Sequence, residues 1–237
     1  RLLLQSRFDD MDTTGWTFAS GNWQLDTDKS MRLRQTDWSG GIAAAGSLSW
    51  TDVIAKANVK LIDAASGGGF AQLNVRHQDA NNKYFAFIAS TNQIALVKKE
   101  GGVQTTLASK TYPVELGKEY TLQVAAVGDV LELYVDGRKE LSAADSAFAS
   151  GRVALETWNA DASYDDITIQ SGAPTVLFSD TFDSGSMSNW TVAAGAWTIE
   201  NGATKVLRSG STTGEAVLNA GSFGDFSLEA AVKLNAA

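Results

Sequence analysis

Residues 53–61 read VIAKANVKL, and this stretch alternates strictly between two kinds of side chain. Its odd-numbered positions carry Val, Ala, Ala, Val and Leu, whereas its even-numbered positions carry Ile, Lys, Asn and Lys. Successive side chains of a β-strand point to opposite faces, so this pattern predicts a strand with one face buried. The same period of two recurs in four other segments: 71–77, 120–125, 131–135 and 153–158.

The rest of the first 170 residues favours the same architecture. Further strands are expected at 83–89, 93–98, 103–108 and 164–169. Turn signals such as Asp136-Gly137 separate the segments. The one helix-like run, 141–148, is short and rich in Ala and Ser, and we expect a loop there. The sequence therefore predicts an all-β fold in which antiparallel strands form a β-sandwich or barrel.

An internal repeat sets the domain organisation. Phe8, Trp16 and Trp23 recur at positions 182, 190 and 197, and the strand at 53–61 recurs near the end of the chain. We therefore expect a complete module at 1–171, a linker at 172–175, and the truncated start of a second, homologous module at 176–237. Residues that both copies use identically are expected to serve a common core. Unpaired strand edges in 176–237 would favour self-association.

Composition excludes several classes of function. The formal net charge is −8, which disfavours binding to nucleic acid or to an anionic membrane surface. No apolar run approaches the ~20 residues that span a bilayer. The absence of cysteine excludes disulfides, thiolate metal sites and a cysteine nucleophile. These features are typical of a bacterial secreted protein, so we expect an extracellular location.

Five motifs in order resemble those of a known family, and the first is the opening series Phe8, Trp16 and Trp23. Residues 76–84, RHQDANNKY, look like the R-x-x-D-x-x-N-x-Y hairpin of concanavalin A-like jelly rolls, and 131–137, LELYVDG, look like their v-Y-v-D-G hairpin. Residues 151–155, GRVAL, and 163–169, SYDDITI, resemble the two motifs that follow. The chain is thus similar to the laminin-G-like and 3-keto-disaccharide-hydrolase-like group, which includes the fructan-binding family 66 carbohydrate-binding modules.

This resemblance implies two sheets of five to seven strands, one of which is curved into a concave platform. In many relatives the platform or the loops at its edge bind sugar. Sugar recognition needs amides, carboxylates and guanidinium groups for hydroxyls, with an aromatic face against the ring. The candidate ligand-binding residues are Gln72, Asn74, Arg76, Tyr134, Glu156, Trp158 and the loop residue Trp38. Alternatively, these side chains are only the solvated faces of two sheets.

The resemblance also implies a structural calcium ion where the first and last strands meet. Its oxygen ligands would come from Asp9 (or its neighbour Asp10), Asp165 and Asp166. One departure is that Ser6 stands where the second copy has Asp180, so an acidic ligand is missing. Alternatively, Asp165 and Asp166 only cap the edge of the last strand.

The sequence favours a non-catalytic carbohydrate-binding module. It would be one of a tandem set that binds a polysaccharide or oligosaccharide, and it would share its parent chain with a catalytic domain that degrades polysaccharides. Two alternatives stay open: a catalytic domain of the 3-keto-glycoside hydrolase type, using Glu132 and Glu156, and a laminin-G-like adhesion or structural module. The only histidine, His77, lies on the apolar face of its predicted strand, and we expect it to be a satisfied core or interface residue.

Overall fold

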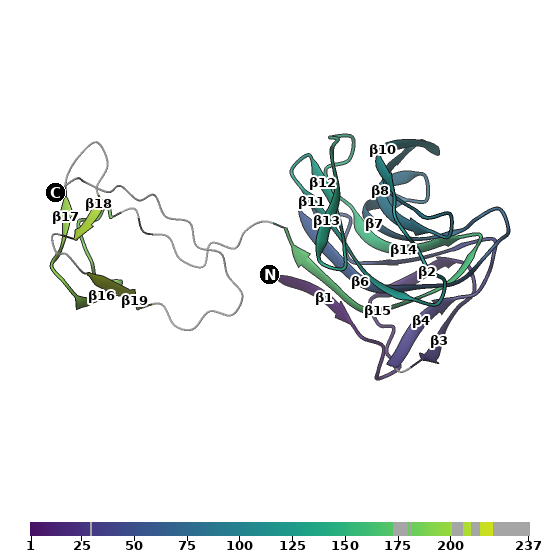
Figure 1. Cartoon of the computed structure of the whole chain (residues 1–237), viewed down its shortest axis with the longest axis horizontal. Coiled ribbons are helices and arrows are strands. Elements are labelled where there is room, and N and C mark those ends of the chain that lie inside the picture. The colour runs from purple at the N-terminus through teal and green to yellow at the C-terminus, as the bar shows by residue number, and fades with distance from the viewer. Residues whose placement is uncertain (29, 173–179, 181, 201–205, 210–213, 220–237) are drawn as a thin grey trace. The chain divides into compact units, whose positions relative to one another are not determined.

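The computed structural model describes all residues except 29, 173–179, 181, 201–205, 210–213 and 220–237. The chain divides into two compact units, Arg1–Pro174 and Thr175–Ala237 (Figure 1). Every regular element in the described part is a β-strand, and nothing there forms a helix long and apolar enough to cross a membrane. Apart from Gly172, the predicted linker lies outside the described residues.

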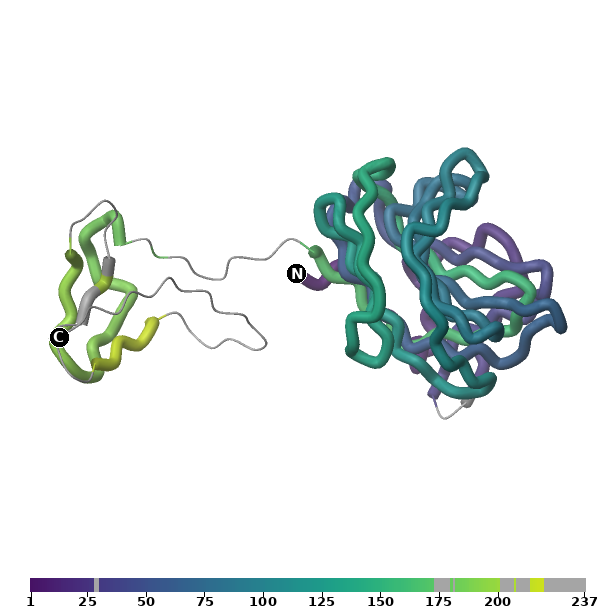
Figure 2. The backbone as a smooth tube through the Cα atoms, turned by 45° about the horizontal axis from the view of Figure 1, so that its top comes forward, coloured from purple at the N-terminus to yellow at the C-terminus, as the bar shows by residue number. Residues whose placement is uncertain are grey.

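The first unit is a sandwich of two antiparallel sheets (Figures 1 and 2). The eight-stranded sheet has the order β13-β12-β11-β6-β15-β4-β3, and β1 pairs with β15. Its strands are β1 (Leu2–Ser6), β3 (Trp23–Asp28), β4 (Ser30–Gln35), β6 (Val53–Ala64), β11 (Glu119–Val127), β12 (Val130–Val135), β13 (Arg138–Ala144) and β15 (Ala160–Ser171).

The seven-stranded sheet has the order β10-β9-β8-β7-β14-β5-β2. Its strands are β2 (Trp16–Ser20), β5 (Gly41–Ala45), β7 (Phe70–Asp79), β8 (Asn82–Ala89), β9 (Gln93–Glu100), β10 (Val103–Thr111) and β14 (Arg152–Trp158). The predicted all-β antiparallel sandwich is confirmed.

The core lies between the two sheets and follows the alternation seen in the sequence. In β6 the five apolar odd-numbered positions from Val53 to Leu61 are fully buried, while β11 and β15 pair with this strand on its two sides. Trp16 is buried in the core and Trp23 packs against it, as the repeat predicted. Burial of this apolar face stabilises the sandwich by roughly 25 cal/mol for each Å² removed from water.

One predicted loop is a strand. Residues 141–144 belong to β13, where Leu141 pairs with Leu133 of β12. The turn that joins these strands, Asp136-Gly137, has positive φ at both residues, 50° and 79°. Such a two-residue turn matches the twist of a hairpin. The hairpin therefore carries the Ala-rich run into the sheet, although the run itself has little strand propensity.

The second unit has four described strands: β16 (Trp190–Ala194), β17 (Trp197–Glu200), β18 (Val206–Ser209) and β19 (Glu215–Leu218). β16 pairs with β19 and β17 with β18, just as β2 pairs with β5 and β3 with β4 in the first unit. Asp180 and Ser6 play the same role in the two units. Asp180 accepts a hydrogen bond of 2.9 Å from the indole of Trp190, and Ser6 accepts one of 3.0 Å from the indole of Trp16. The repeated residues therefore make the same local contacts in both units.

Candidate functional site

Four of the predicted ligand-binding residues lie together on the outer face of the seven-stranded sheet. In β7, Leu73 and Val75 point into the core, so Gln72 and Asn74 point outward. The neighbouring strand β14 places Glu156 directly opposite Gln72. Trp158 follows two residues later on the same face. The alternation of two adjacent strands thus builds one polar and aromatic surface, which we call the outer-face site.

Glu156 is the centre of the polar part of this site. It accepts a hydrogen bond of 2.7 Å from the side-chain amide of Asn74 and a second one from the ammonium of Lys83. Lys83, on β8, is 1% exposed and also lies 5.8 Å from the ring centre of Phe85. Burial lowers the pKa of Lys83, and the charge of Glu156 opposes that shift. The carboxylate is therefore held in one position.

An aromatic row adjoins the polar part. Trp158 stacks on Phe70 with ring centres 5.3 Å apart, and Phe70 stacks on Phe87 at 4.9 Å. Trp158 is 49% exposed although it belongs to a regular strand. An indole that keeps this much apolar surface in water offers a flat face for a ligand.

The Trp38 loop lies beside the same end of the site. Gly40, with φ of +99°, approaches so closely that a Cβ atom there would lie 2.6 Å from the backbone oxygen of Thr157. The same Cβ atom would lie 3.7 Å from Cα of Trp158. Trp38 itself is 43% exposed. The fold thus brings the loop that carries Trp38 next to the end of the strand that carries Trp158.

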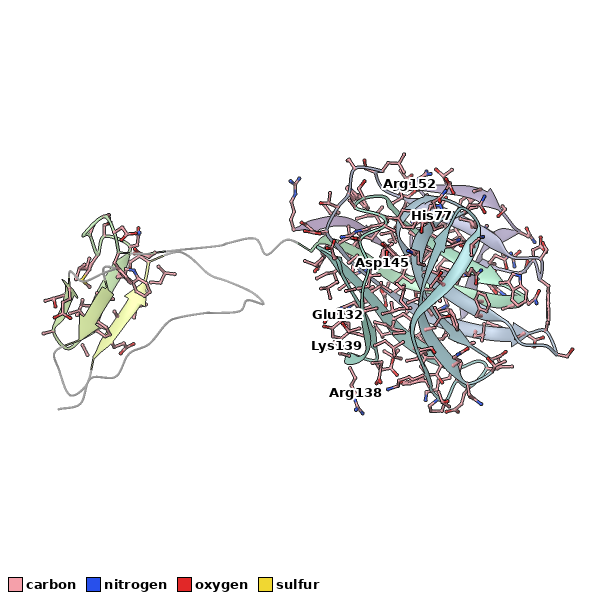
Figure 3. All side chains as sticks on the ribbon, turned by 90° about the horizontal axis from the view of Figure 1, so that it is seen from above. His77, Glu132, Arg138, Lys139, Asp145 and Arg152 are labelled. Atoms are coloured by element: carbon pink, nitrogen blue, oxygen red, sulfur yellow. The ribbon has the colours of Figure 1, made fainter. Side chains whose placement is uncertain are left out.

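A β-bulge changes the faces of the next two residues. Arg76 has a left-handed φ of 47°, and the pairing of β7 with β14 shifts register between Asn74 and His77. His77 therefore pairs with Arg152 and joins the outer-face site, where Figure 3 shows the two side by side. The prediction that Arg76 shares a face with Asn74 is wrong for this reason, and of the two places expected for His77, the core and an interface, the bulge excludes the core.

Arg76 instead anchors the edge of the sandwich. Its guanidinium donates to the backbone oxygens of Thr51 at 3.1 Å, Phe148 at 2.9 Å and Gly128 at 2.6 Å, and it lies 3.4 Å from a carboxylate oxygen of Asp52. The residue is 2% exposed. With its donors occupied by the chain, Arg76 is placed to hold three loops and not a ligand.

Four buried polar atoms of the outer-face site have no hydrogen-bond partner. They are Oε1 of Gln72, Oδ1 of Asn74, Nδ1 of His77 and Nε of Arg152. A buried polar atom without a partner costs about 1–3 kcal/mol, so nearly all such atoms are paired in folded proteins. Two carbonyl acceptors and a guanidinium donor on one surface are suited to a ligand that both donates and accepts hydrogen bonds.

The electrostatics of His77 set its protonation state. Burial, together with the positive charges of Lys83 and Arg152, lowers its pKa to about 4, and the negative charge of Asp79 opposes this shift. The imidazole is therefore neutral at physiological pH. A neutral ring can accept a hydrogen bond at one nitrogen and donate at the other, as a hydroxyl-bearing ligand requires.

Two predicted residues lie elsewhere. Tyr134 alternates with core residues of β12 and therefore lies on the outer face of the other sheet, where its hydroxyl donates to Glu132 at 2.7 Å. Glu132 and Glu156 consequently occupy opposite outer faces of the sandwich and cannot flank one glycosidic bond. Tyr134, predicted as a ligand-binding residue, is thus separated from the candidates on β7 because β12 is in the eight-stranded sheet.

The predicted calcium ligands have protein partners. Asp165 accepts a hydrogen bond from Ser30 at 2.5 Å and lies 3.7 Å from the guanidinium of Arg32, while Asp166 accepts one from Asn58 at 3.0 Å. A guanidinium at this place disfavours a cation, and the described residues contain no group of three or more His, Cys, Asp or Glu side chains that could hold a metal ion. These residues do not fit the implied calcium site, and Asp9 has no such group around it either.

Sequence reasoning missed five members of the outer-face site: Phe70, His77, Lys83, Phe87 and Arg152. A signal existed for β8, because Lys83, Phe85 and Phe87 occupy alternate positions and therefore lie on one face of the strand. Two of these residues are large and apolar, as in a core face, so the alternation alone could not show which face of β8 is buried between the sheets. His77 gave no signal, since a bulge is invisible to a strict period of two, whereas Arg152 lies on the same side of the β14 alternation as Glu156 and Trp158.

Comparison with known proteins is informative at this point. No family model matches the chain. The levanase of Bacillus subtilis is 30% identical over 159 residues, which cover 67% of this chain and 23% of the levanase. A family 66 carbohydrate-binding module of Bacillus subtilis aligns with 28% identity and a TM-score of 0.60, over 67% of this chain and 96% of the module. The chain has the concanavalin A-like jelly-roll fold and resembles the family 66 module.

A third comparison concerns the fold of this jelly-roll module alone. A Bacillus subtilis protein of unknown function with a galectin-like fold aligns with a TM-score of 0.54 at 11% identity, over 72% of this chain and 96% of that protein. The resemblance expected from the sequence motifs is confirmed. Because the chain spans only 23% of the levanase, the activity of the whole levanase is not carried over with the fold.

Proposed function

We propose that the first unit is a carbohydrate-binding module that holds a glycan on its outer-face site. The observation that carries this proposal is the set of four unpartnered buried polar atoms next to the half-exposed Trp158. Hydroxyl groups of a sugar can both donate to the amide oxygens and accept from Arg152. The indole of Trp158 then covers the apolar C–H face of a ring, as aromatic side chains commonly do.

The similarity to a family 66 module and to a levanase supports the same proposal and suggests which polymer to test first. A levanase acts on levan, so a fructan is the first candidate ligand. We further propose that the two units are tandem modules of a secreted polysaccharide-degrading enzyme. Linked weak sites on a repeating polymer gain avidity, which gives a tandem arrangement a physical purpose.

The module is proposed to be non-catalytic. Cleavage of a glycosidic bond by the usual mechanism requires two carboxyl groups about 5–10 Å apart. Glu156 is held by Asn74 and Lys83 as a hydrogen-bond acceptor, and Glu132 faces the opposite side of the sandwich. The carboxylate of Glu156 is therefore assigned to binding.

Affinity electrophoresis of the full chain against a polysaccharide panel tests the proposal. Levan, inulin, xylan, glucan and an acidic polymer would each be cast in a native gel. We expect retardation by at least one neutral polymer, with fructans tested first, and no release of reducing sugar. A chain that is folded by circular dichroism but migrates normally in every gel would contradict the proposed function.

A further inference from the structure

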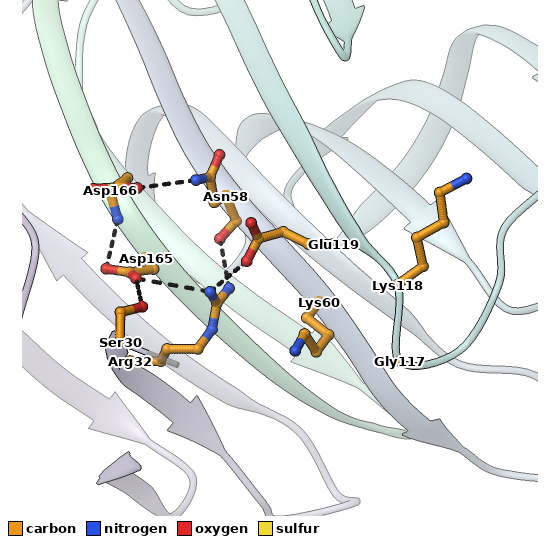
Figure 4. Close-up of a pocket in the computed structure, with 9 residues that line it drawn as sticks. All are labelled: Ser30, Arg32, Asn58, Lys60, Gly117, Lys118, Glu119, Asp165 and Asp166. Carbon is orange, nitrogen blue, oxygen red and sulfur yellow. Dashed lines mark hydrogen bonds and ion pairs between the residues drawn. The ribbon is translucent and has the colours of Figure 1, made fainter. Parts of the chain in front are cut away.

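The outer face of the eight-stranded sheet carries a hollow that is separate from the outer-face site. Two adjoining spaces of about 330 and 440 Å³ share Arg32, Lys60 and Gly117 in their walls. Strands β4, β6 and β15 form its floor, and the turn before β11 forms one side (Figure 4). Because the two sheets are packed back to back, this hollow faces away from Trp158. Its size is in the range of small-ligand sites.

Buried charges build the wall of this hollow. Arg32 is 3% exposed and donates to Glu119, to Ser163 at 3.0 Å and to the backbone oxygen of Asn58 at 3.4 Å. Asp165 is also 3% exposed and lies 3.7 Å from Arg32. Removing charged side chains from water in this way costs free energy, even when the charges are paired. Buried polar groups held in this way are pre-organised, which is what a binding wall requires.

A second β-bulge turns two consecutive acids into the hollow. Asp166 has a left-handed φ of 48°, and the pairing of β15 with β6 shifts register between Asp165 and Thr168. In a regular strand, neighbouring side chains point to opposite faces. Here both Asp165 and Asp166 line the hollow, and Asn58 donates to Asp166 at 3.0 Å. The irregularity therefore adds hydrogen-bond acceptors to one surface.

The chemistry of the lining indicates the class of ligand. Four acidic and four basic side chains surround the hollow, so it has no excess of charge that would favour an ion. Ile62 is its one large apolar side chain, which disfavours an apolar ligand. Donors and acceptors that together line a hollow of this size match a neutral molecule with adjacent hydroxyl groups.

We propose that this hollow is a second saccharide-binding site, specific for a neutral, hydroxyl-rich ligand and independent of stacking on an aromatic ring. The module then has sites on both faces of its sandwich. A polysaccharide chain on one face leaves the other face available, so one module can bridge two chains. This proposal goes beyond the outer-face site and does not require that the two sites bind the same sugar.

The test uses the full chain, isotopically labelled, titrated with neutral fructo-, xylo- and gluco-oligosaccharides of four to six units. Trp158→Ala removes the outer-face site. In this background we expect residual binding with amide shifts at Gly117, Glu119 and Asp166. Adding Ile62→Trp fills the hollow and is expected to weaken the residual binding at least tenfold. The matched control, Lys56→Trp, adds the same bulk to an exposed position of the same strand face and should change it less than twofold.

Each outcome bears on a defined claim. Residual binding that Ile62→Trp leaves unchanged, or no shifts at the hollow while the wild type binds at Trp158, would overturn the second site and leave the proposed function standing. No binding of any sugar by the folded wild type would overturn both. Should Ile62→Trp fail to fold, Asp166→Asn serves instead, because asparagine tolerates the left-handed backbone, and we expect it to weaken the residual binding at least threefold.

Discussion

Arg76 gives the sharpest test of how the fold positions the outer-face site. Replacing it with methionine keeps most of the aliphatic stem but removes every donor. The backbone oxygens of Thr51, Gly128 and Phe148 then lose a charged partner. The segments that carry Thr51 and Gly128 also lose their link to β7. The residue is buried, so water cannot replace the guanidinium freely.

The size of the effect follows from these contacts. A hydrogen bond to a charged group contributes about 1.5–3 kcal/mol, and removing one partner of a buried charged network costs about 3–5 kcal/mol in total. We therefore expect Arg76→Met to lower the free energy of unfolding by about 3–5 kcal/mol. For a unit of this size, each kcal/mol shifts the melting temperature by about 2–4 °C, so a decrease of roughly 6–20 °C is predicted.

Urea and thermal unfolding of the full chain, followed by tryptophan fluorescence, measure this effect. The matched control is Arg138→Met, because the side chain of Arg138 is 87% exposed and its loss should cost less than about 0.5 kcal/mol. A variant Arg76→Met with native stability that no longer binds sugar would refute the anchoring role and restore Arg76 as a ligand contact.

Two further predictions concern the same region. His77 has a folded-state pKa of about 4 against about 6.5 when unfolded, so only the unfolded chain takes up this proton as the pH falls from 6.5 to 4. Over that window the free energy of unfolding should decrease by up to about 3 kcal/mol more in the wild type than in His77→Gln. Urea titration of both proteins at each pH measures this difference. The prediction is contradicted if the free energy of unfolding changes equally with pH in the two proteins. Gly40→Ala should lower stability by about 2 kcal/mol or more, because its Cβ atom meets the backbone oxygen of Thr157 at 2.6 Å. Gly101→Ala has the same kind of positive φ but open space around it, so a calorimetric melt of the two variants separates the steric contact from the backbone cost.

Much of the fold follows from local pattern. The strict alternation of residues 53–61 identified the central strand of the larger sheet, and Asp136-Gly137 marked a hairpin that the structure contains. The repeat correctly assigned Trp16 and Trp23 to the core. These features depend on neighbouring residues only, so they can be read from the sequence without knowing which strands pair.

The membership of the site is a longer-range property. Tyr134 and Glu156 carry similar local patterns, but sheet topology places them on opposite outer faces. Arg76 and His77 exchanged their expected roles because one bulge breaks the period of two. Pairing partners and bulges are decided by contacts between distant segments, and no local pattern reports them. Trp158 could be predicted because it is a large apolar residue on an otherwise polar parity.

The central claim is that a sugar binds at the outer face of the seven-stranded sheet. Isothermal titration of the full chain with the polysaccharide identified by gel retardation tests it directly, comparing Trp158→Ala with Tyr134→Ala. Both variants remove a ring from an outer sheet face, but only Trp158 lies beside Glu156 and the unpartnered amides. We predict that Trp158→Ala weakens binding at this site at least tenfold, a loss of about 1.4 kcal/mol, and that Tyr134→Ala changes it less than twofold. Equal affinities for Trp158→Ala and the wild type, or a large loss in Tyr134→Ala alone, would contradict the claim.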